Sequence, residues 1–456
     1  MDRSGYQRLR GAHLQAVQAA LADHVRRLDW SADEIDRYHE HRLRALLAYA
    51  RERSPFYADR LAGLNTATVT VADLPSIPVL TKAEAQAHWD DIVTAPGFDR
   101  ARAEQVLAEQ DWFSYTADDA QVFSSGGSSG VRGVYVWDWQ FFITTACLAW
   151  RMQVREERRA PALERTRLAV LTAGLPPHAS TVLFDIPTVA DMDTVVIEAG
   201  APFGEVLAAV VRADPTHLVG YPSVIGRLAR AALAGELAIR PVRVSTNSEP
   251  LSPEDRAAIT AAWDVPIHNL WGSTELGVQA VGCGRAAGLH ICSDEVILQR
   301  VDGDGSPVPP DEPAARTVAT GLSNRTFPFV RYDLGDDITM LAEPCPCGSA
   351  FPRIAEVSGR RDDDFSYGPH TVPASAFRHV LGTDPAILEY QVRQTPHGVE
   401  VLVVSSSEVN TLTADLTAAM RRYGLPNPQV RIRRLPSLDR HAASGKLKRF
   451  VPLAGR

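Results

Sequence analysis

Strand-like and helical segments alternate between residues 140 and 270, and this alternation limits the possible folds more than any other feature of the chain. Residues 168–173, 194–198 and 217–221 are short runs of apolar or β-branched side chains, whereas residues 203–212 and 223–234 carry helical periodicity. Because strands that alternate with helices pair in parallel, we expect an α/β domain.

The segments on both sides of this region have different patterns. Residues 14–53 repeat apolar side chains at steps of three and four, which predicts a helical cap near the N-terminus. Thr81, with Glu84 three residues later, predicts the start of a helix. A β-rich subdomain is predicted by the runs at 295–301, 315–320 and 329–332.

A charged stretch at residues 359–364 has no apolar anchor before Phe365, and we interpret it as a hinge. We therefore expect two domains, residues 1–361 and residues 362–456. The second has a small α+β pattern, with helices at 375–381 and 410–423 and strands at 387–393, 399–405 and 429–433.

The composition excludes some classes of function. A chain of 456 residues with 45% hydrophobic and 22% charged residues is an ordinary soluble protein with room for two or more domains. The formal net charge of −8 does not indicate an extended basic surface that would bind nucleic acid or an anionic membrane. The chain has no run of 18 apolar residues and no signal-peptide core at its N-terminus, so we expect a cytoplasmic location.

Residues 124–130 read Ser-Ser-Gly-Gly-Ser-Ser-Gly, a composition that cannot pack a core. Free backbone N–H groups and small hydroxyls of this kind can wrap around phosphate oxygens, although a flexible linker has the same composition. The β-prone runs at 120–123 and 134–137 favour a tight strand-to-strand connection. The Gly-Lys-Ser/Thr ending of a Walker A motif is missing, so other motifs must decide the ligand.

Three further motifs carry side chains suited to a nucleotide. Trp271, Thr274 and Glu275 lie within five residues after a strand-like run and could stack a base, touch a phosphate and hold a divalent cation. Asp336 offers a carboxylate for a ribose diol, and Lys446 offers an ammonium near the C-terminus. Each motif alone is a weak signal.

In this order the motifs resemble the adenylate-forming superfamily of acyl-CoA ligases, and within it the phenylacetate-CoA ligase-like branch. The resemblance extends from about residue 35 to residue 449. It implies a large N-terminal adenylation domain with mixed sheets, helices and a β-rich subdomain, and a small mobile α+β C-terminal domain that pivots at Asp362. It rests on six ordered motifs, at residues 124–133, 247–251, 271–275, 331–336, 359–363 and 445–446.

The resemblance also implies roles for single residues. Trp271 would lie against adenine, and Asp336 and Arg360 would bind the ribose hydroxyls. Thr274 would reach the α-phosphate, Glu275 would hold Mg²⁺, and Lys446 would enter the site for the first half-reaction. The complete set implied to hold the nucleotide is Ser124, Ser125, Gly126, Gly127, Ser128, Ser129, Gly130, Ser248, Glu249, Pro250, Trp271, Gly272, Ser273, Asp336 and Arg360.

The chain departs from the branch at several positions. The loop commonly carries Lys where this chain has Val131, and the neighbouring Arg132 replaces that charge only in part. Leu251 stands where the branch often has Trp, which affects the acyl pocket. Candidates for that pocket are Tyr221, Ser245, Asn247 and Leu276, and their polarity favours a hydroxy- or amino-substituted ring.

The resulting hypothesis is an acid–thiol ligase that uses ATP and Mg²⁺ to adenylate a carboxylic acid, which we expect to be aromatic, and passes the acyl group to coenzyme A. Other acceptors, a carrier-protein thiol or an amine, stay open, as does a nucleotide-binding homologue without turnover. The expected partners are the small acid, ATP and coenzyme A, together with a second copy in a homodimer. Nucleic acid and membrane are not expected partners.

Cysteine placement predicts a metal site. Cys283, His290, Cys345 and Cys347 supply three thiolates and an imidazole, the set for a closed tetrahedral zinc site with a structural role. The alternative is a group of unlinked buried thiols and a satisfied histidine. Cys147 and Cys292 are expected to pack inside the core.

Overall fold

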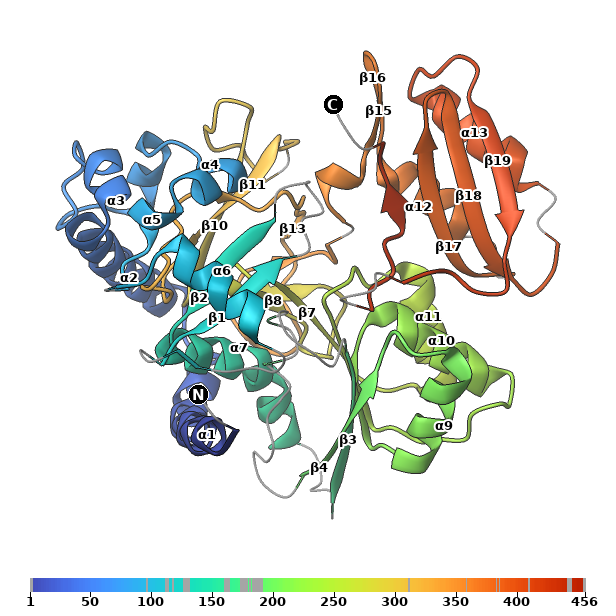
Figure 1. The fold of residues 1–456 in the computed structure, drawn as a ribbon, viewed down its shortest axis with the longest axis horizontal. Helices are drawn as coiled ribbons and strands as arrows, with labels where there is room; N and C mark the ends of the chain where they lie inside the picture. The colour runs from blue at the N-terminus through green and yellow to red at the C-terminus, as the bar shows by residue number, and fades with distance from the viewer. Residues whose placement is uncertain are drawn as a thin grey trace.

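The computed structural model describes residues 3–95, 97–110, 115–116, 119–125, 132–159, 165–172, 179, 182, 192–310, 312–357, 359–382, 384, 386–408, 411–440 and 445–453. Mixed sheets with helices make up most of the molecule, and a smaller unit lies beside them at the C-terminal end of the chain (Figure 1).

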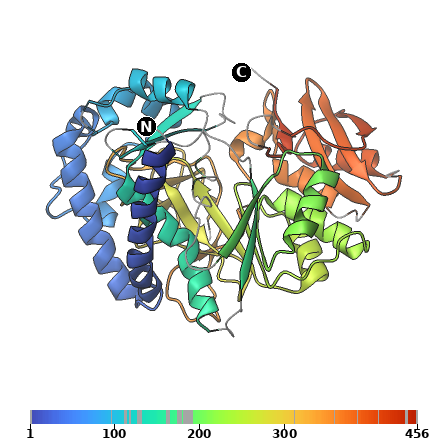
Figure 2. The same cartoon turned by 60° about the horizontal axis from the view of Figure 1, so that its bottom comes forward.

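The N-terminal part is helical, as its periodicity predicts. The two long helices of this part are α1 (Arg3–Arg27) and α2 (Ala32–Arg53), drawn in blue in Figure 2. Thr81 caps the helix that follows it by accepting a hydrogen bond from the backbone N–H of Glu84, which confirms that prediction. The shorter elements are α3 (Pro55–Arg60), a 3-10 helix (Val71–Ser76), α4 (Lys82–Ala87), α5 (Trp89–Ile92) and α6 (Arg100–Glu109).

A hairpin flanks the Ser/Gly segment. Strands β1 (Gln121–Ser125) and β2 (Gly133–Trp137) pair antiparallel, with Ser125 opposite Gly133. The predicted strand-to-strand connection is therefore confirmed, while residues 126–131 lie outside the described residues. Helix α7 (Trp139–Glu157) follows, with Asp138 as its N-cap.

A nine-stranded sheet forms the centre of the molecule, in the order β13-β14-β9-β8-β7-β6-β5-β3-β4. Its strands β4, β3, β5, β6 and β7 pair in parallel, as the alternating pattern predicts, and the remaining strands pair antiparallel. The bounds are β3 (Thr166–Thr172), β4 (Met192–Glu198), β5 (His217–Gly220), β6 (Arg243–Asn247), β7 (Ile267–Ser273), β8 (Gly277–Val281), β9 (Leu289–Ile291), β13 (Met340–Leu341) and β14 (Arg353–Ile354).

Helices cover both faces of the parallel strands. Alternate residues of β3 show the two faces, because Leu168 and Val170 belong to one core and Ala169 and Leu171 to another. Helix α7 lies on the first side, and α9 (Phe203–Ala213), α10 (Pro222–Leu233) and α11 (Pro253–Trp263) lie on the second (Figures 1 and 2). Burial on both faces explains why these strands are nearly continuous apolar runs.

The β-rich region contains a three-stranded antiparallel sheet of β10 (Val296–Val301), β11 (Arg316–Gly321) and β12 (Tyr332–Asp333). The prediction of a strand over 329–332 is mostly wrong, since only Tyr332 of that run pairs. The backbone N–H groups of Val330 and Arg331 donate to the side chains of Tyr57 and Thr320, and Arg331 has a positive φ of 52°. These side-chain contacts replace a strand partner.

A buried ion-pair cluster ties the helices to the β-rich region. Both terminal nitrogens of Arg151 on α7 donate to Asp294, at 2.6 and 2.9 Å. Arg27 of α1 and Arg42 of α2 bond Glu295 at 3.0 and 2.9 Å. His24 lies near both carboxylates, but three guanidinium groups already neutralise them, so this group does not fit a metal ion.

The C-terminal unit, residues 365–453, has its own hydrophobic core. Its two helices and the three predicted strands occupy the predicted positions, whereas the strands at 365–367, 370–372 and 450–451 were not predicted, and its four-stranded sheet has the order β19-β18-β17-β20. The domain boundary at 361/362 stays a prediction. The elements are β15 (Phe365–Tyr367), β16 (His370–Val372), α12 (Ala374–Gly382), β17 (Ile387–Thr395), β18 (Gly398–Ser405), α13 (Leu412–Arg422), β19 (Gln429–Arg434) and β20 (Phe450–Val451), and a 3-10 turn (Arg361–Asp363) precedes them.

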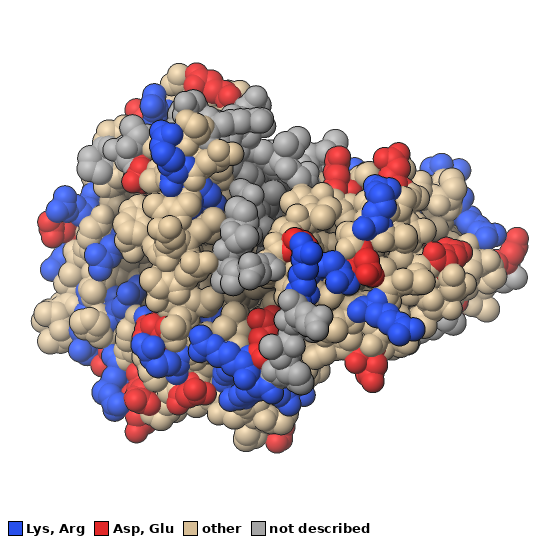
Figure 3. All heavy atoms as spheres, turned by 90° about the horizontal axis from the view of Figure 1, so that it is seen from below, with Lys and Arg blue, Asp and Glu red and all other residues tan. Residues whose placement is uncertain are grey.

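The surface carries both signs of charge. On the face shown in Figure 3, basic and acidic side chains alternate with uncharged surface, so the described residues of this face do not form a uniformly basic area. None of the helices in the described ranges is long and apolar enough to cross a membrane.

Candidate active site

Three segments far apart in the chain bring Trp271, Asp336 and Arg360 together. Trp271, on β7, donates its indole N–H to Oδ2 of Asp336 at 3.0 Å, and Nε of Arg360 lies 3.5 Å from Oδ1. Burial raises the pKa of Asp336, and the Arg360 guanidinium opposes that shift. The three residues that the resemblance assigns to adenine and ribose thus form one contact group.

The turn after β7 places Glu275 inside the protein. A Cβ at Gly272 would lie 2.7 Å from the carbonyl oxygen of Gly277, so the close approach of the two strands requires glycine there. The backbone N–H of Leu276 closes the turn by donating to the Ser273 hydroxyl at 3.3 Å. The carbonyl oxygen of Thr274 accepts from the indole of Trp137 at 2.8 Å.

Two tyrosine hydroxyls hold the Glu275 carboxylate. Tyr135 of β2 and Tyr332 of β12 donate to its Oε1 at 2.6 and 3.1 Å. Burial and the charge of Glu275 raise the pKa of both tyrosines well above the usual value, so both stay protonated donors. No described residue hydrogen-bonds Oε2, which leaves that oxygen for a cation. Neither tyrosine was predicted as a site residue: Tyr135 lies in an apolar strand, and Tyr332 lies in the motif at residues 331–336, from which only Asp336 was assigned a role.

Lys82 reaches the edge of the Ser/Gly segment. Its Nζ, at the start of α4, donates to the Ser125 hydroxyl at 3.0 Å. Arg132, expected to replace part of the missing loop charge, instead pairs with Glu104 at 2.6 Å, and 53% of its side chain is exposed. Lys82 was not among the residues predicted to bind phosphate. A possible signal was its place in the first turn of a helix, where the dipole disfavours a cation.

Lys446 lies beside Tyr221, the residue that precedes α10. Its Nζ is 5.8 Å from the centre of the Tyr221 ring. The next residue, Leu447, donates its backbone N–H to Oε1 of Glu249 at 2.8 Å, and Ser223 donates its own to Oε2 at 3.3 Å. Burial lowers the pKa of Lys446, and Glu249 opposes that shift.

Gly445 permits this approach of the lysine segment. It has a positive φ of 64°, and a Cβ there would lie 3.1 Å from the backbone nitrogen of Gly200.

The structure places Glu249, a predicted nucleotide residue, against the C-terminal segment through its bond to Leu447. Its neighbour Ser248 has a φ of 67° and donates to Oδ1 of Asn247 at 2.9 Å, and Pro250 is exposed.

The four predicted substrate residues lie in three places. Ser245 and Asn247 line a small cavity of about 10 Å³ under α7, together with Gln153. Tyr221 lies beneath Lys446, and Leu276 packs against Gly321 on β11. The loop residues Gly126, Gly127, Ser128, Ser129 and Gly130, and the side chain of the predicted pivot Asp362, lie outside the described residues.

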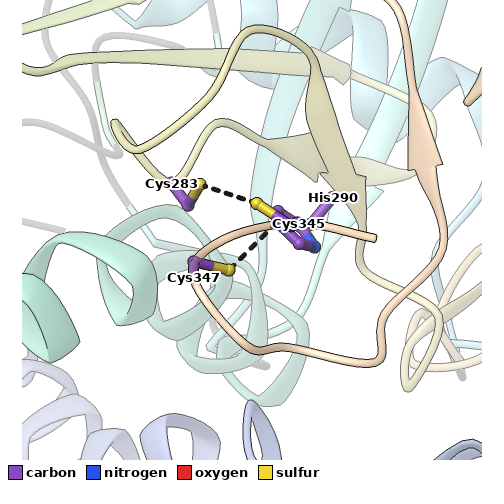
Figure 4. Close-up of side chains that lie close together, drawn as sticks. All are labelled: Cys283, His290, Cys345 and Cys347. Atoms are coloured by element: carbon purple, nitrogen blue, oxygen red, sulfur yellow. Dashed lines mark hydrogen bonds between the residues drawn. The ribbon is translucent and has the colours of Figure 1, made fainter. Parts of the chain in front are cut away.

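Cys283, His290, Cys345 and Cys347 meet in one buried cluster (Figure 4). The Sγ atoms of Cys283 and Cys345 are 3.5 Å apart, Sγ of Cys347 is 3.3 Å from Nε2 of His290, and all four ligand atoms lie within 4.8 Å of one another. Nδ1 of His290 donates to the carbonyl oxygen of Phe351 at 3.2 Å, which leaves Nε2 for a metal.

The separations suit a tetrahedral ion, since bonds of about 2.3 Å to sulfur place two thiolates roughly 3.7 Å apart. Cys147 and Cys292 are buried outside this cluster, which confirms the prediction that they pack inside.

Comparison with known proteins supports the class that these motifs indicate. No protein-family model matches the chain. A phenylacetate-coenzyme A ligase of Thermus thermophilus is 24% identical over 370 residues, which are 77% of this chain and 76% of that protein. The matched region contains most of the chain, in agreement with the resemblance drawn from the ordered motifs.

Solved structures give the fold. A 2-hydroxyisobutyryl-CoA ligase in the postadenylation state, in complex with R3-HIB-AMP, matches with a TM-score of 0.72 and 18% identity over 94% of this chain and 92% of that one. The same enzyme in the thioesterification state, in complex with 2-HIB-AMP and CoA, matches with a TM-score of 0.59 and 18% identity over 94% and 91% of the two chains. The fold class is confirmed as that of the adenylate-forming CoA ligases.

Proposed function

We propose that this chain is an AMP-forming acid–thiol ligase, which adenylates a carboxylic acid with ATP and transfers the acyl group to coenzyme A. One observation carries the proposal: Trp271 with Glu275, Asp336 and Lys446, from three separate segments, lie near the carboxyl ends of β5, β6 and β7. Ligands bind at such strand ends in open α/β sheets. The CoA ligases found by comparison support the same activity.

The residues of this chain suit the first half-reaction. Asp336 and Arg360 would hold the ribose hydroxyls, and the indole of Trp271, fixed by its bond to Asp336, would lie against the base. Mg²⁺, when bound, would neutralise phosphate charge, and Oε2 of Glu275 is the oxygen placed to hold it. Lys446 would supply a second positive charge where the acid attacks the α-phosphate.

Lys82 and the Ser/Gly segment would hold the pyrophosphate that leaves. The Lys82 ammonium touches the Ser125 hydroxyl, so it lies where a phosphate bound by that hydroxyl would be. This contact would replace the lysine that the loop lacks at Val131, and it weakens the alternative of a homologue without turnover.

The second half-reaction requires Lys446 to leave, because the thiol needs access to the acyl-adenylate. We infer that the C-terminal unit adopts the orientation of the first half-reaction in this structure. The contact of Lys446 with Tyr221 supports this orientation, as does the higher TM-score against the postadenylation structure. Rotation at the 361–363 turn, about Asp362, would present a different surface to the adenylate.

The substrate would be an aromatic acid whose ring reaches towards Ser245 and Asn247. Their polar side chains, which in this structure bond Gln153 and Ser248, would hydrogen-bond a hydroxyl or amino substituent on that ring in place of those partners. A panel of benzoic and phenylacetic acids, with and without these substituents, tests this inference. Equal rates with substituted and unsubstituted acids would contradict it.

The acceptor is tested separately. With the best acid of the panel and ATP, we expect coenzyme A to give a thioester and AMP, detected by mass spectrometry. An amide formed with an added amine, or acyl transfer to a carrier-protein thiol, while coenzyme A gives no product, would favour the other acceptors.

We also propose that Cys283, His290, Cys345 and Cys347 hold a structural Zn²⁺. The ion would cross-link the segment after β8, strand β9 and the turn before β14. Cys345→Ser should remove zinc from the purified chain and lower its melting temperature. Cys147→Ser, at a buried thiol outside the cluster, is the matched control and should retain the metal. Wild-type protein without bound metal after refolding with Zn²⁺ would contradict the proposal.

A further inference from the structure

The C-terminal unit contacts α10 and α11 through arginines on both sides of Lys446 (Figure 1). Arg449 contacts Asp255 at 2.8 Å and Glu254 at 3.4 Å, both on α11. Arg440 donates to the Ser223 hydroxyl of α10 at 3.0 Å. The two arginines thus anchor the chain nine residues apart, with the lysine between them.

Two buried carboxylates at this interface, Asp255 and Glu389, also have a partner in their own part of the molecule. Asp255 keeps Arg230, at 3.0 Å, and the hydroxyl of its N-cap Ser252, also at 3.0 Å. Glu389, on β17 of the C-terminal unit, contacts Arg227 of α10 at 3.4 Å but also holds Arg440 of its own unit at 2.7 Å. Separation of the unit would therefore leave neither acid without a positive partner.

The cations follow the same pattern. The Arg449 guanidinium stacks 4.9 Å from the ring of Tyr390 in its own unit. Arg227 stacks 4.0 Å from the ring of Phe203 in the larger part of the protein. Because an unpaired buried charge is strongly destabilising, a partner within each unit would let these charges separate without being left unpaired.

We propose that Arg440 and Arg449 are positioning residues, which latch the C-terminal unit to α10 and α11 with Lys446 in the active site, and that the duplicate partners let this latch open. The latch acts on Lys446 through the chain that joins the two arginines, and Glu249 adds a third contact by accepting from Leu447. This inference rests on the proposed function, since it assigns the latched state to the adenylation half-reaction.

The two half-reactions should respond differently to loss of the latch. Arg449→Leu removes the contacts to Asp255 and Glu254 but leaves Asp255 paired with Arg230, so the chain should still fold. The equilibrium ratio of latched to open molecules should fall on the order of 10- to 100-fold, the range expected for hydrogen bonds to a charged group. The rate of adenylation should fall with it, while thioester formation from a supplied acyl-adenylate should not.

The kinetic experiment compares Arg449→Leu, Arg440→Leu, Arg449→Lys and Arg431→Leu, the last being an exposed arginine of the same unit. Pyrophosphate exchange is measured with MgATP and phenylacetate, or the best acid of the panel, and thioester formation with the synthetic acyl-adenylate and coenzyme A. We expect kcat of exchange to fall in both leucine variants at an unchanged KM for ATP, partial rescue by lysine, and no change in Arg431→Leu. Equal losses in both half-reactions, or no loss in exchange, would overturn the proposal.

A second experiment needs no turnover. Val211 on α9 and Tyr423 after α13 are 52% and 43% exposed, and the five native cysteines are buried, so Val211→Cys and Tyr423→Cys can carry spin labels. Pulsed electron resonance should give one main distance for the latched chain and a second, larger population with Arg449→Leu. Identical distance distributions would refute the latch. If no acid supports exchange but the distribution shifts, the latch stands and the proposed function fails.

Discussion

Lys82 offers the sharpest test of how this site holds phosphate. The chain lacks a lysine inside the Ser/Gly segment, and two nearby cations could replace it, Lys82 and Arg132. Lys82 contacts the described part of that segment, through the Ser125 hydroxyl at 3.0 Å, whereas Arg132 is bonded to Glu104 and half exposed. Lys82→Met should therefore weaken the use of ATP far more than Arg132→Met.

The size of the effect follows from the geometry. A phosphate oxygen bound by the Ser125 hydroxyl would lie roughly 5 Å from the ammonium, where one unit charge is worth about 3 kcal/mol at an effective dielectric constant near 20. Because each 1.4 kcal/mol is tenfold, kcat/KM for ATP should fall on the order of 100-fold. Loss of the exposed Arg132–Glu104 pair should cost about 1 kcal/mol or less, a few-fold at most.

The assay is pyrophosphate exchange at saturating acid, with MgATP varied and ionic strength held constant. Lys82→Arg serves as a second control and should retain most of the activity, because it keeps the charge. If Arg132→Met loses as much as Lys82→Met, or if Lys82→Met exchanges normally, the assignment of the phosphate-binding cation to Lys82 is wrong.

Two further predictions concern charge. Arg151→Met should lower the free energy of unfolding by about 3–5 kcal/mol in urea titrations, because it leaves the fully buried Asp294 with Arg27 alone, while Arg26→Met, at an exposed pair, should change it by less than about 0.5 kcal/mol. The alkaline limb of the pH profile for adenylation should lie below the usual lysine range, because burial lowers the pKa of Lys446 and the ammonium is lost as pH rises through that value. Glu249 opposes this shift, so Glu249→Gln should move the limb to still lower pH, and a limb that stays or moves upwards would contradict the assignment.

Periodic patterns predicted much of the fold. The apolar runs of β3 and β5 and the periodicity of α9 and α10 are local, and burial on both faces of a parallel sheet explains their composition. The strand expected at 329–332 failed because the backbone there donates to side chains of Tyr57 and Thr320, which lie far away in the sequence. Periodicity has no means to detect such contacts.

Ordered motifs predicted part of the candidate site. Trp271, Asp336 and Arg360 are in contact, and the four predicted metal ligands form one cluster. Lys82 and Tyr135 lie outside those motifs, and the motif at 331–336 did not predict the contact of Tyr332 with Glu275, because these roles depend on contacts across 43 to 140 residues of chain. The position of Glu249 against Leu447 was likewise set by docking of the C-terminal unit and not by its own motif.

The most direct test of the central claim is ATP–pyrophosphate exchange by the wild-type chain across a panel of aromatic and aliphatic acids, with Lys446→Ala measured in parallel. We predict exchange that depends on the acid and on Mg²⁺, and a loss of about 100-fold or more in Lys446→Ala, the range seen when a group that stabilises developing charge is removed. No exchange with any acid, or exchange by Lys446→Ala at the wild-type rate, would contradict the adenylation chemistry proposed for this site.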